Sequence, residues 1–298
     1  MPKPNATPPR IDSLLQKLTL DRLDRDLFLG DPGEGQFRLF GGMVAAQAVA
    51  AAYRTIDAPP DAGPAPSLHS LHAYFLRPGR YDTPVRYVVY RIRDGRSFTT
   101  RDVVAHQAGE AIFNLSCSFV KPEVGVSHQE PAPIVPGPEG MKPWAFMRPD
   151  QIPPAMREQM KKYESDSPIE VLSADPDGPQ EGPTPTRKVW IRPRGELPDE
   201  EWVHAAVLAY ASDMGLIATA RMPHNIPRNR GAGPMPSASL DHAMWFHHPP
   251  RFDDWMLYTS ESPIAHAARA LIFAQMWRRD GTRVASVVQE GLIRTPKG

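Results

Sequence analysis

One carboxylate stands alone in a long apolar stretch of the sequence. Asp213 is the only acidic or basic residue between Ala205 and Ala220, in the run AAVLAYASDMGLIATA. A charged carboxylate on so apolar a helix costs on the order of several kcal/mol unless it is hydrogen-bonded or faces water. We therefore predict that Asp213 lies in a cleft, as a general base or a water-orienting group. The alternative is that it lies on the one wet side of its helix and caps a loop after Gly215.

Two uncharged polar residues lie at the ends of predicted strands. Ser239 directly precedes the strand LDHAMWFHH, and Gln289 follows the apolar run VASVV. Each has an ordinary structural explanation, because serines at strand edges bond to the backbone and a glutamine beside Glu290 is typical of a solvated strand end. The residue types alone do not select either one as functional.

Histidines and aspartates near residue 250 suggest a metal site, and Cys117 suggests a nucleophile, but both signals are weak. Neighbouring histidines on a strand point to opposite faces, and Pro249-Pro250 stiffens the chain that follows. Cys117 has strand neighbours and no adjacent base, so we expect a small core residue. We predict no metal ion at the first group, which comprises His242, His247, His248, Asp253 and Asp254.

A pair of glycines opens a predicted helix. The free N–H groups and the dipole at the start of a helix favour an anion or a polarised carbonyl, so Gly41-Gly42 is a candidate binding position. The same glycines could equally allow close packing of the helix on a sheet. The sequence has no G-x-S-x-G, P-loop, G-x-G-x-x-G or H-E-x-x-H signature.

The elements that must position these residues recur in the same order twice. In the first part, leucines between charges predict a surface helix over 11–27, and the charge-free run predicts a buried helix over 37–56. Four runs rich in β-branched and aromatic residues follow between 67 and 120, separated by the dipeptides Pro-Gly, Asp-Gly and Ala-Gly. This punctuation predicts an antiparallel meander, and hence an α+β unit.

The second part repeats this pattern. We predict entry strands over 168–174 and 187–193, a second buried helix over 200–220 and four further strands up to residue 294. The two meanders match at an offset of 171 residues, which becomes 172 in the last hairpin. The matched pairs are Phe75 with Phe246, Pro78 with Pro249, Arg80 with Arg251 and Gly109 with Gly281. A duplication with diverged halves explains this match.

The same offsets predict one active site for each chain. They carry the three candidate polar residues onto positions that hold no polar side chain, so the site is expected in the second half. The pairs are Asp213 with Gly42, Ser239 with Leu68 and Gln289 with Cys117.

The composition narrows the function classes. The chain has 298 residues, with 34 Lys and Arg against 34 Asp and Glu, and this balance argues against nucleic acid and anionic membranes as partners. We expect no membrane span and no signal segment. One cysteine fits a reducing compartment, so we expect a cytoplasmic protein. Sixteen of the 35 prolines lie in 121–200, which predicts a linker between two parts.

Five motifs in order are similar to the acyl-CoA thioesterase II (TesB-type) family. They are LFGGMVAAQAV, LHAYFLRPG with RDGRSFTTRDVVAHQAGEAIF, YASD, LDHAMWFH and VVQEG, and the similarity covers about Leu14 to Arg294. The resemblance implies an α+β double hotdog fold, in which each half wraps an antiparallel sheet around one long helix and the sheets join edge to edge. The implied domains are an N-terminal hotdog over 11–120, a proline-rich linker over 121–167 and a C-terminal hotdog over 168–295.

The resemblance also implies an activity. Members of the family hydrolyse acyl-CoA to CoA and a carboxylic acid without a metal or organic cofactor, through an Asp, a Thr or Ser, and a Gln that hold the attacking water. By motif these are Asp213, Ser239 and Gln289, with acyl-CoA as the substrate. The serine keeps the hydroxyl of the threonine found in some relatives but lacks the methyl that restricts its rotamer. Family members commonly assemble further, so we expect a homo-oligomer, either a dimer or a tetramer.

Two other functions stay open on the residues. Double hotdogs also serve as enoyl-CoA hydratases that use an Asp and a His, and Asp241-His242 with His247 keep this alternative in view. A non-catalytic acyl-CoA-binding protein would retain the fold, but it would be expected to lose part of the trio, whose three residue types are all present.

Overall fold

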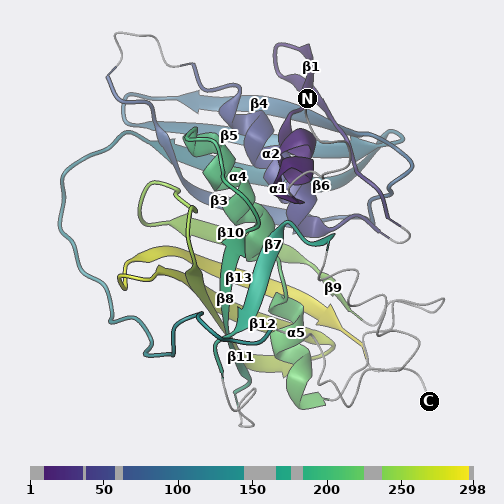
Figure 1. Cartoon of the computed structure of the whole chain (residues 1–298). Coiled ribbons are helices and arrows are strands. Elements are labelled where there is room, and N and C mark those ends of the chain that lie inside the picture. Colours follow the sequence, from purple (N-terminus) through teal and green to yellow (C-terminus); the bar gives the residue numbers. More distant parts are fainter. Residues whose placement is uncertain are drawn as a thin grey trace, which may run out of the picture.

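The computed structural model describes residues 10–35, 38–57, 63–143, 166–175, 184–224 and 237–294. In this part of the chain, helices lie against one face of a long antiparallel sheet (Figure 1). The helices are α1 (Arg10–Leu18), α2 (Gly41–Tyr53), α4 (Glu201–Ser212), α5 (Leu216–Arg221) and the 3-10 turn η2 (Met222–His224).

The two apolar helices α2 and α4 lie side by side and run in opposite directions. The first turn of α2 meets the end of α4, where Gly42 N–H donates to Asp213. The last residue of α2 meets the start of α4, where the Tyr53 hydroxyl donates to Glu201. Both helices are charge-free between their first and last turns because neighbouring protein surrounds them.

The first half supplies six strands of the sheet. They are β1 (Asp21–Asp24), β2 (Leu27–Gly30), β3 (Ser67–Phe75), β4 (Val85–Asp94), β5 (Phe98–Gln107) and β6 (Glu110–Val120). The second half supplies β7 (Ile169–Ser173), β8 (Thr186–Pro193), β9 (Ser237–Ser239), β10 (Asp241–Phe246), β11 (Met256–His266), β12 (Arg269–Arg278) and β13 (Arg283–Ile293).

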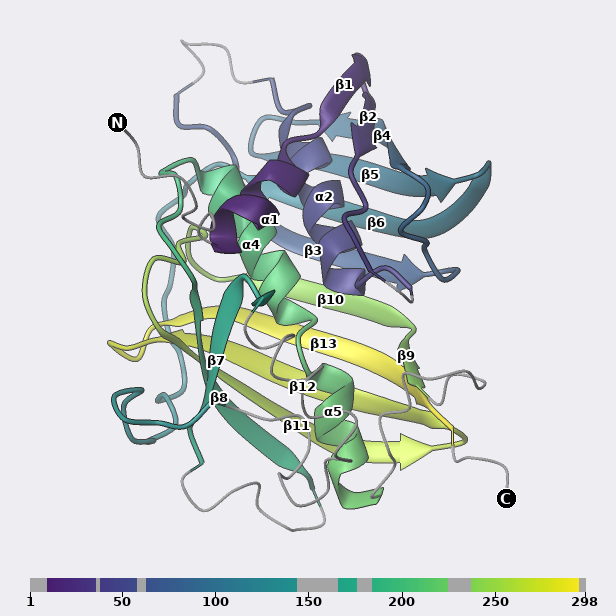
Figure 2. The ribbon, with the colours of Figure 1, turned by 45° about the vertical axis from the view of Figure 1, so that its right-hand side comes forward.

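One continuous sheet joins the halves. Its strand order is β1-β2-β4-β5-β6-β3-β10-β13-β12-β11-β8-β7, with β9 paired to β13, and every pairing is antiparallel. The junction is β3 against β10, where Leu71 lies opposite Met244 (Figure 2). The sheet of each half therefore covers one long helix, and the two sheets meet at their edges as the resemblance implied.

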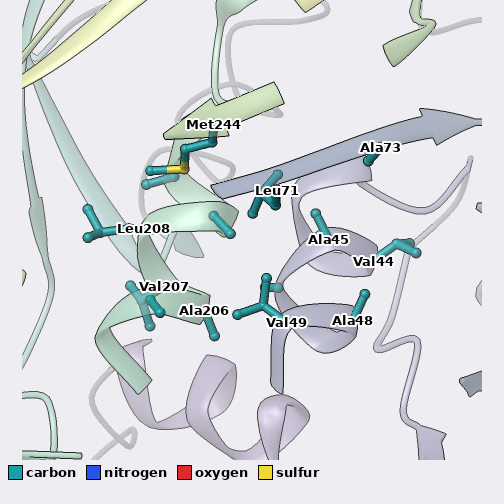
Figure 3. Packing of buried hydrophobic residues seen from close by; sticks show 14 of the residues in the cluster. Val44, Ala45, Ala48, Val49, Leu71, Ala73, Ala206, Val207, Leu208 and Met244 are labelled. Carbon is teal, nitrogen blue, oxygen red and sulfur yellow. The ribbon is translucent and has the colours of Figure 1, made fainter. Parts of the chain in front are cut away.

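The core lies between the helix pair and the concave face of the sheet. Figure 3 shows Val49 of α2 and Ala206 of α4 in the space between the two helices, with Leu71 and Met244 on the sheet side. Small residues along both helices allow their backbones to approach closely, which is why alanine dominates the two apolar runs.

The N-terminal region differs from its prediction. Only Arg10–Leu18 is helical, and the rest of the predicted helix over 11–27 gives way to strand β1 and the start of β2. The leucine spacing is correct for α1, whose Ile11, Leu14 and Leu18 are buried. The helix is therefore an amphipathic cover on the helix pair, with its apolar stripe facing inward.

The stretch Glu201–His224 is, by length and composition alone, apolar enough to cross a membrane, although the sequence predicts no membrane span. However, 72% of its most apolar window is buried inside the protein. A core helix enclosed by a sheet and a second helix has the same composition, and that enclosure is the physical reason for the apolar run.

The chain after β6 crosses the outer face of the second half. Residues 121–143 have no helix or strand, and Ala132, Val135 and Met141 lie against a second apolar cluster on that face. The Trp190 indole donates to Pro136 O over 2.8 Å, and Pro143 forms a β-bridge with Leu172. We call residues 121–143 the strap. Residues 144–165 of the predicted linker lie outside the described residues.

The duplication has different offsets in its helices and its strands. Helix α2 begins at residue 41 and α4 at residue 201, an offset of 160, whereas β4 and β11 begin at 85 and 256, an offset of 171. The prediction that Asp213 corresponds to Gly42 is therefore wrong, because its counterpart along the helix is Tyr53. The physical reason is an insertion between helix and first strand in the second half, which contains α5 and η2.

Candidate active site

Asp213 lies where the second apolar helix ends. It is the residue after the last turn of α4, and Gly215 follows in the left-handed region at φ 79° before α5 begins. The continuous helix predicted over 200–220 is therefore wrong at this point. Glycine adopts a positive φ without the penalty that a Cβ brings, so Gly215 turns the chain and leaves Asp213 at a helix end.

The carboxylate of Asp213 reaches across to the start of α2. Its Oδ2 accepts a hydrogen bond from Gly42 N–H over 2.9 Å, and its Oδ1 accepts one from the Ser239 hydroxyl over 3.2 Å. The first N–H groups of a helix have no intrahelical acceptor, and the helix dipole favours a negative charge beside them. The start of α2 thus holds the carboxylate in place.

The glycine pair is required by this approach. A Cβ on Gly42 would lie 2.5 Å from the backbone oxygen of Tyr210, and a Cβ on Gly41 would lie 2.8 Å from Asp213 Oδ2. The two explanations that the sequence left open therefore both apply, since the same glycines allow close packing and present an N–H group to an anion.

Gln289 completes the group of three predicted residues. Its Nε2 donates to the Ser239 hydroxyl over 3.1 Å, and the two side chains come from neighbouring strands β13 and β9. Gln289 is fully buried, while Ser239 and Asp213 are partly exposed. The structure therefore places all three residues in one hydrogen-bonded row, with its open end at Asp213 and Ser239.

Burial sets the electrostatics of the row. Desolvation raises the pKa of Asp213 above its ordinary value of 3.8. This rise is opposed, in decreasing order, by the imidazole of His242, the Gly42 N–H, the Ser239 hydroxyl and the charge of Arg38. A carboxylate with a raised pKa is a stronger base than a solvated one, so the position suits proton transfer from water.

Two side chains from the sheet clamp the turn that carries Asp213. The Tyr258 hydroxyl donates to Ser212 O over 2.5 Å, and the Arg187 guanidinium donates to Met214 O over 3.1 Å. Arg187 is buried, which lowers its pKa to about 10, and it lies 5.4 Å from the centre of the Tyr258 ring. Both backbone carbonyls beside Asp213 are thus fixed.

Sequence reasoning missed these clamping residues. Arg187 and Tyr258 lie in strands whose alternation of apolar residues predicts core positions, and nothing in that pattern indicates that their polar ends reach the helix terminus. The only available signal is a charged residue at an inward position of β8, where Arg187 alternates with buried Val189 and Ile191.

The residues of the hydratase alternative do not converge. The Asp241 carboxylate accepts the backbone N–H of Glu290 over 2.6 Å, and the His247 imidazole bonds to Ser286 over 2.6 Å at the surface. The His242 ring lies inside, where its Nδ1 is 2.7 Å from Gln289 Oε1. Neighbouring residues of a strand point to opposite faces, so Asp241 and His242 face apart.

The remaining candidates have structural surroundings. Cys117 is buried, and burial raises the pKa of its thiol, so a reactive thiolate is disfavoured. Within the described ranges, no three His, Cys, Asp or Glu side chains come together as a metal site. In the group near residue 250, Asp253 forms an ion pair with Arg251.

Comparison with solved structures places the fold in a class. A protein with a hot dog fold from Alicyclobacillus acidocaldarius aligns with a TM-score of 0.73, at 18% identity over 96% of this chain and 99% of that one. The acyl-CoA thioesterase II TesB2 from Mycobacterium marinum aligns with a TM-score of 0.77, at 34% identity over 96% of this chain and 98% of that one. The α+β double hotdog prediction is confirmed.

Comparison with sequences defines the family. Residues 31–120 match the acyl-CoA thioesterase N-terminal domain, and residues 138–293 match the acyl-CoA thioesterase C-terminal domain. The chain is 36% identical to mouse acyl-coenzyme A thioesterase 8 over 93% of its length and 87% of that protein. It is 35% identical to Haemophilus influenzae acyl-CoA thioesterase 2 over 95% and 98% respectively. The chain belongs to the acyl-CoA thioesterase family, of the type II (TesB-type) group.

Proposed function

We propose that this protein hydrolyses acyl-CoA thioesters to CoA and a free carboxylic acid at the Asp213 site. The observation that carries the proposal is the partly exposed carboxylate held between the N-terminus of α2 and the Ser239 hydroxyl, in a chain of this family. The reaction needs a positioned water, a polarised carbonyl and a leaving thiol. Asp213 and Ser239 are the partly exposed members of the row and supply the first requirement.

The attacking water donates one hydrogen bond to Asp213 and one to Ser239. This leaves a lone pair of its oxygen free to attack the thioester carbon while Asp213 accepts the proton. The C–O bond forms, the carbonyl becomes an oxyanion, and collapse of the tetrahedral adduct breaks the C–S bond. Asp213 then returns the proton to the thiolate or to solvent. A thiol with a pKa of about 8.5 leaves with little help from an acid.

The start of α2 also suits the oxyanion. The Gly41 N–H begins the helix and has no intrahelical acceptor, and it lies beside the Gly42 N–H that binds Asp213. During the attack one negative charge moves from the carboxylate to the oxyanion. Both positions lie in the field of the same helix terminus, so the charge moves without leaving its stabilising dipole.

Gln289 acts in this scheme through Ser239. Its side chain is fully buried, so it holds the serine hydroxyl rather than meeting the water itself. The first half contributes the start of α2, whose Gly42 N–H binds Asp213.

A thiol-release assay tests the proposal. The full-length protein is incubated with saturated acyl-CoAs of increasing chain length and a chromogenic thiol reagent. Release of one thiol for each acyl group is the expected result, and the series gives the chain-length preference. A hydratase would instead consume the absorbance of an enoyl-CoA and leave the thioester intact. A binding protein would bind the acyl-CoA and release no thiol, and either outcome would refute the proposal.

We also propose that the protein works in the cytoplasm as a homo-oligomer, a dimer or a tetramer. The single buried thiol fits a reducing compartment. Tyr90 and Ile92 are each at least half exposed and lie two residues apart on β4, so they form a small exposed apolar surface on one face of the sheet that a subunit contact would cover. Light scattering on the purified protein measures the oligomer, and a monomeric mass would refute that part.

A further inference from the structure

We propose that His242 is a positioning residue of this site, which keeps the Gln289 amide in the one orientation that directs the Ser239 hydroxyl to Asp213. The proposal rests on the proposed function, because thioester hydrolysis is its readout. His242 comes from β10, the strand that joins the two halves, and its imidazole extends the catalytic row away from the open end.

A continuous chain of hydrogen bonds links five side chains. From the interior outward, the distances are 2.8 Å from Ser212 Oγ to His242 Nε2, 2.7 Å from His242 Nδ1 to Gln289 Oε1, 3.1 Å from Gln289 Nε2 to Ser239 Oγ and 3.2 Å from Ser239 Oγ to Asp213 Oδ1. Ser212 and Asp213 are neighbours in sequence, so the chain begins and ends at the same helix terminus.

The directions of the three bonds from His242 to Asp213 follow from the carboxylate. An ionised Asp213 can only accept, so the Ser239 hydroxyl must donate to it. The serine has a single proton, so Gln289 must present its Nε2 to that oxygen. Its Oε1 then faces His242, and Nδ1 must carry a proton. The working site therefore requires a donor at position 242.

Ser212 maintains that donor in both charge states of the imidazole. Its hydroxyl lies 2.8 Å from His242 Nε2 and 2.9 Å from Ala209 O, which accepts its proton in the second arrangement. When the ring is neutral, the serine donates to Nε2. When the ring is cationic, Nε2 donates to the serine, which turns its proton to the carbonyl. The proton on Nδ1 stays in both cases.

Burial makes the histidine necessary. His242 is 1% exposed, and Ser212 and Gln289 are fully buried, so this part of the row is closed to bulk water. Without the Nδ1 donor, the amide can turn and present its oxygen to Ser239. The serine then donates to the amide and releases Asp213, so neither the hydroxyl nor the carboxylate is held in the position that orients the attacking water.

The test compares leucine, asparagine and glutamine at position 242 in the full-length protein. Asparagine places an N–H near the Nδ1 position, whereas glutamine reaches toward Ser212 and leaves Gln289 without its donor. We expect His242→Leu to lower kcat by about 10- to 100-fold with KM within about twofold, because it misplaces the water rather than the substrate. His242→Asn is expected to retain kcat within about fivefold of the wild type, and His242→Gln to fall well below it.

A double variant separates positioning from structural damage. If His242 acts through the amide, His242→Leu lowers kcat by no more than about twofold when Gln289→Ala is already present. His247→Leu, one residue beyond the far end of β10, is the matched control and is expected to leave kcat within about twofold.

Three outcomes would overturn the proposal. They are a folded His242→Leu with unchanged kcat, a glutamine variant as active as the asparagine variant, and an undiminished effect of His242→Leu on top of Gln289→Ala. The asparagine and glutamine pair keeps the test valid if the leucine variant does not fold. A wild-type protein that releases no thiol would instead refute the proposed function.

Discussion

The antiparallel helix pair has two ends, and the duplication makes them counterparts. At one end, the start of α2 faces the end of α4 and holds Asp213. At the other end, the start of α4 faces the end of α2, and Tyr53 occupies the position that corresponds to Asp213. The strand offsets place Leu68 and Cys117 where the active end has Ser239 and Gln289.

The second end is filled by the tyrosine. The Tyr53 hydroxyl donates to Glu201 over 2.9 Å and accepts the backbone N–H of Leu68 over 3.1 Å, while its ring meets Phe119 edge-on at 4.8 Å. At the Asp213 end, Gly42 stands where the other end has Trp202, and the absence of a side chain lets the Asp213 carboxylate reach the Gly42 N–H. In this scaffold, the end proposed to be active has glycines and a row of polar side chains, whereas an aromatic ring occupies the other end.

The largest effect is expected from removing the carboxylate. Asp213→Asn should lower kcat for thiol release by about 10² to 10⁴-fold, because the amide cannot accept the proton of water. The folded state raises the pKa of Asp213, so the ionised form costs stability above that pKa, and the neutral amide should keep the melting temperature at pH 8 at or above that of the wild type. Steady-state kinetics and thermal unfolding measure both. Activity that survives within tenfold would remove Asp213 from its role.

Adding one methyl group to the glycine pair should give the next largest effect. Gly42→Ala places a Cβ at 2.5 Å from Tyr210 O, so the ends of α2 and α4 must separate and the N–H must leave Asp213. We expect kcat to fall by about 100-fold. Gly125→Ala is the matched control, since a Cβ there has no heavy atom within 4 Å, and its kinetics should equal those of the wild type. Equal activity of both variants would show that the bare helix start is not what distinguishes the two ends.

The pH dependence should report the carboxylate. Its pKa is raised by burial, so thiol release should fall with decreasing pH at a higher pH than an ordinary aspartate would give. The Ser239 hydroxyl lowers that pKa, so Ser239→Ala should move the acid limb of the kcat profile further upward. Profiles of the wild type and the variant between pH 4 and 9 measure the shift. A limb that moves downward would contradict the hydrogen bond from Ser239 to Asp213.

The smallest effect on catalysis belongs to the structural end. Tyr53→Phe removes a partly buried hydroxyl that bonds to Glu201 and to the Leu68 N–H, so the free energy of unfolding should fall by about 1 to 3 kcal/mol. The value of kcat should stay within about twofold. Urea unfolding and the thiol assay test the pair of expectations. A large loss of kcat would mean that the Tyr53 end also supports catalysis, and that the two ends do not have separate structural and catalytic roles.

The fold was largely predictable because its strongest signals are local. The charge-free runs around Val44 and Val207 can be accommodated only by enclosure, and the turn dipeptides mark the strands between them. The repeat then gives the arrangement. The error over 11–27 has a physical cause, since leucines between charges suit an amphipathic helix and an edge hairpin equally well.

The candidate site was predictable only through its motifs. The isolated charge of Asp213 is visible in the sequence, but its position after a helix end depends on the positive φ of Gly215. Ser239 and Gln289 have ordinary surroundings in sequence, and the resemblance alone singled them out. The sequence suggests His242 as the partner of Asp241, because the two residues are adjacent. Neighbouring residues of a strand face opposite sides, so the structure separates this pair. Contacts between distant strands carry no local signal.

The strap has a consequence for where the second half begins. Its residues cover Trp190, Trp255 and Trp277 on the outer face, and the Arg192 guanidinium closes over Trp255 at 4.4 Å. The family match for the C-terminal domain begins at residue 138, inside the strap. The strap thus packs as part of the second half rather than as a tether between two bodies. A fragment that starts at the first strand of that half would lose the cover of three indole rings. A stable C-terminal fragment of this protein must therefore include the strap as well as the strands.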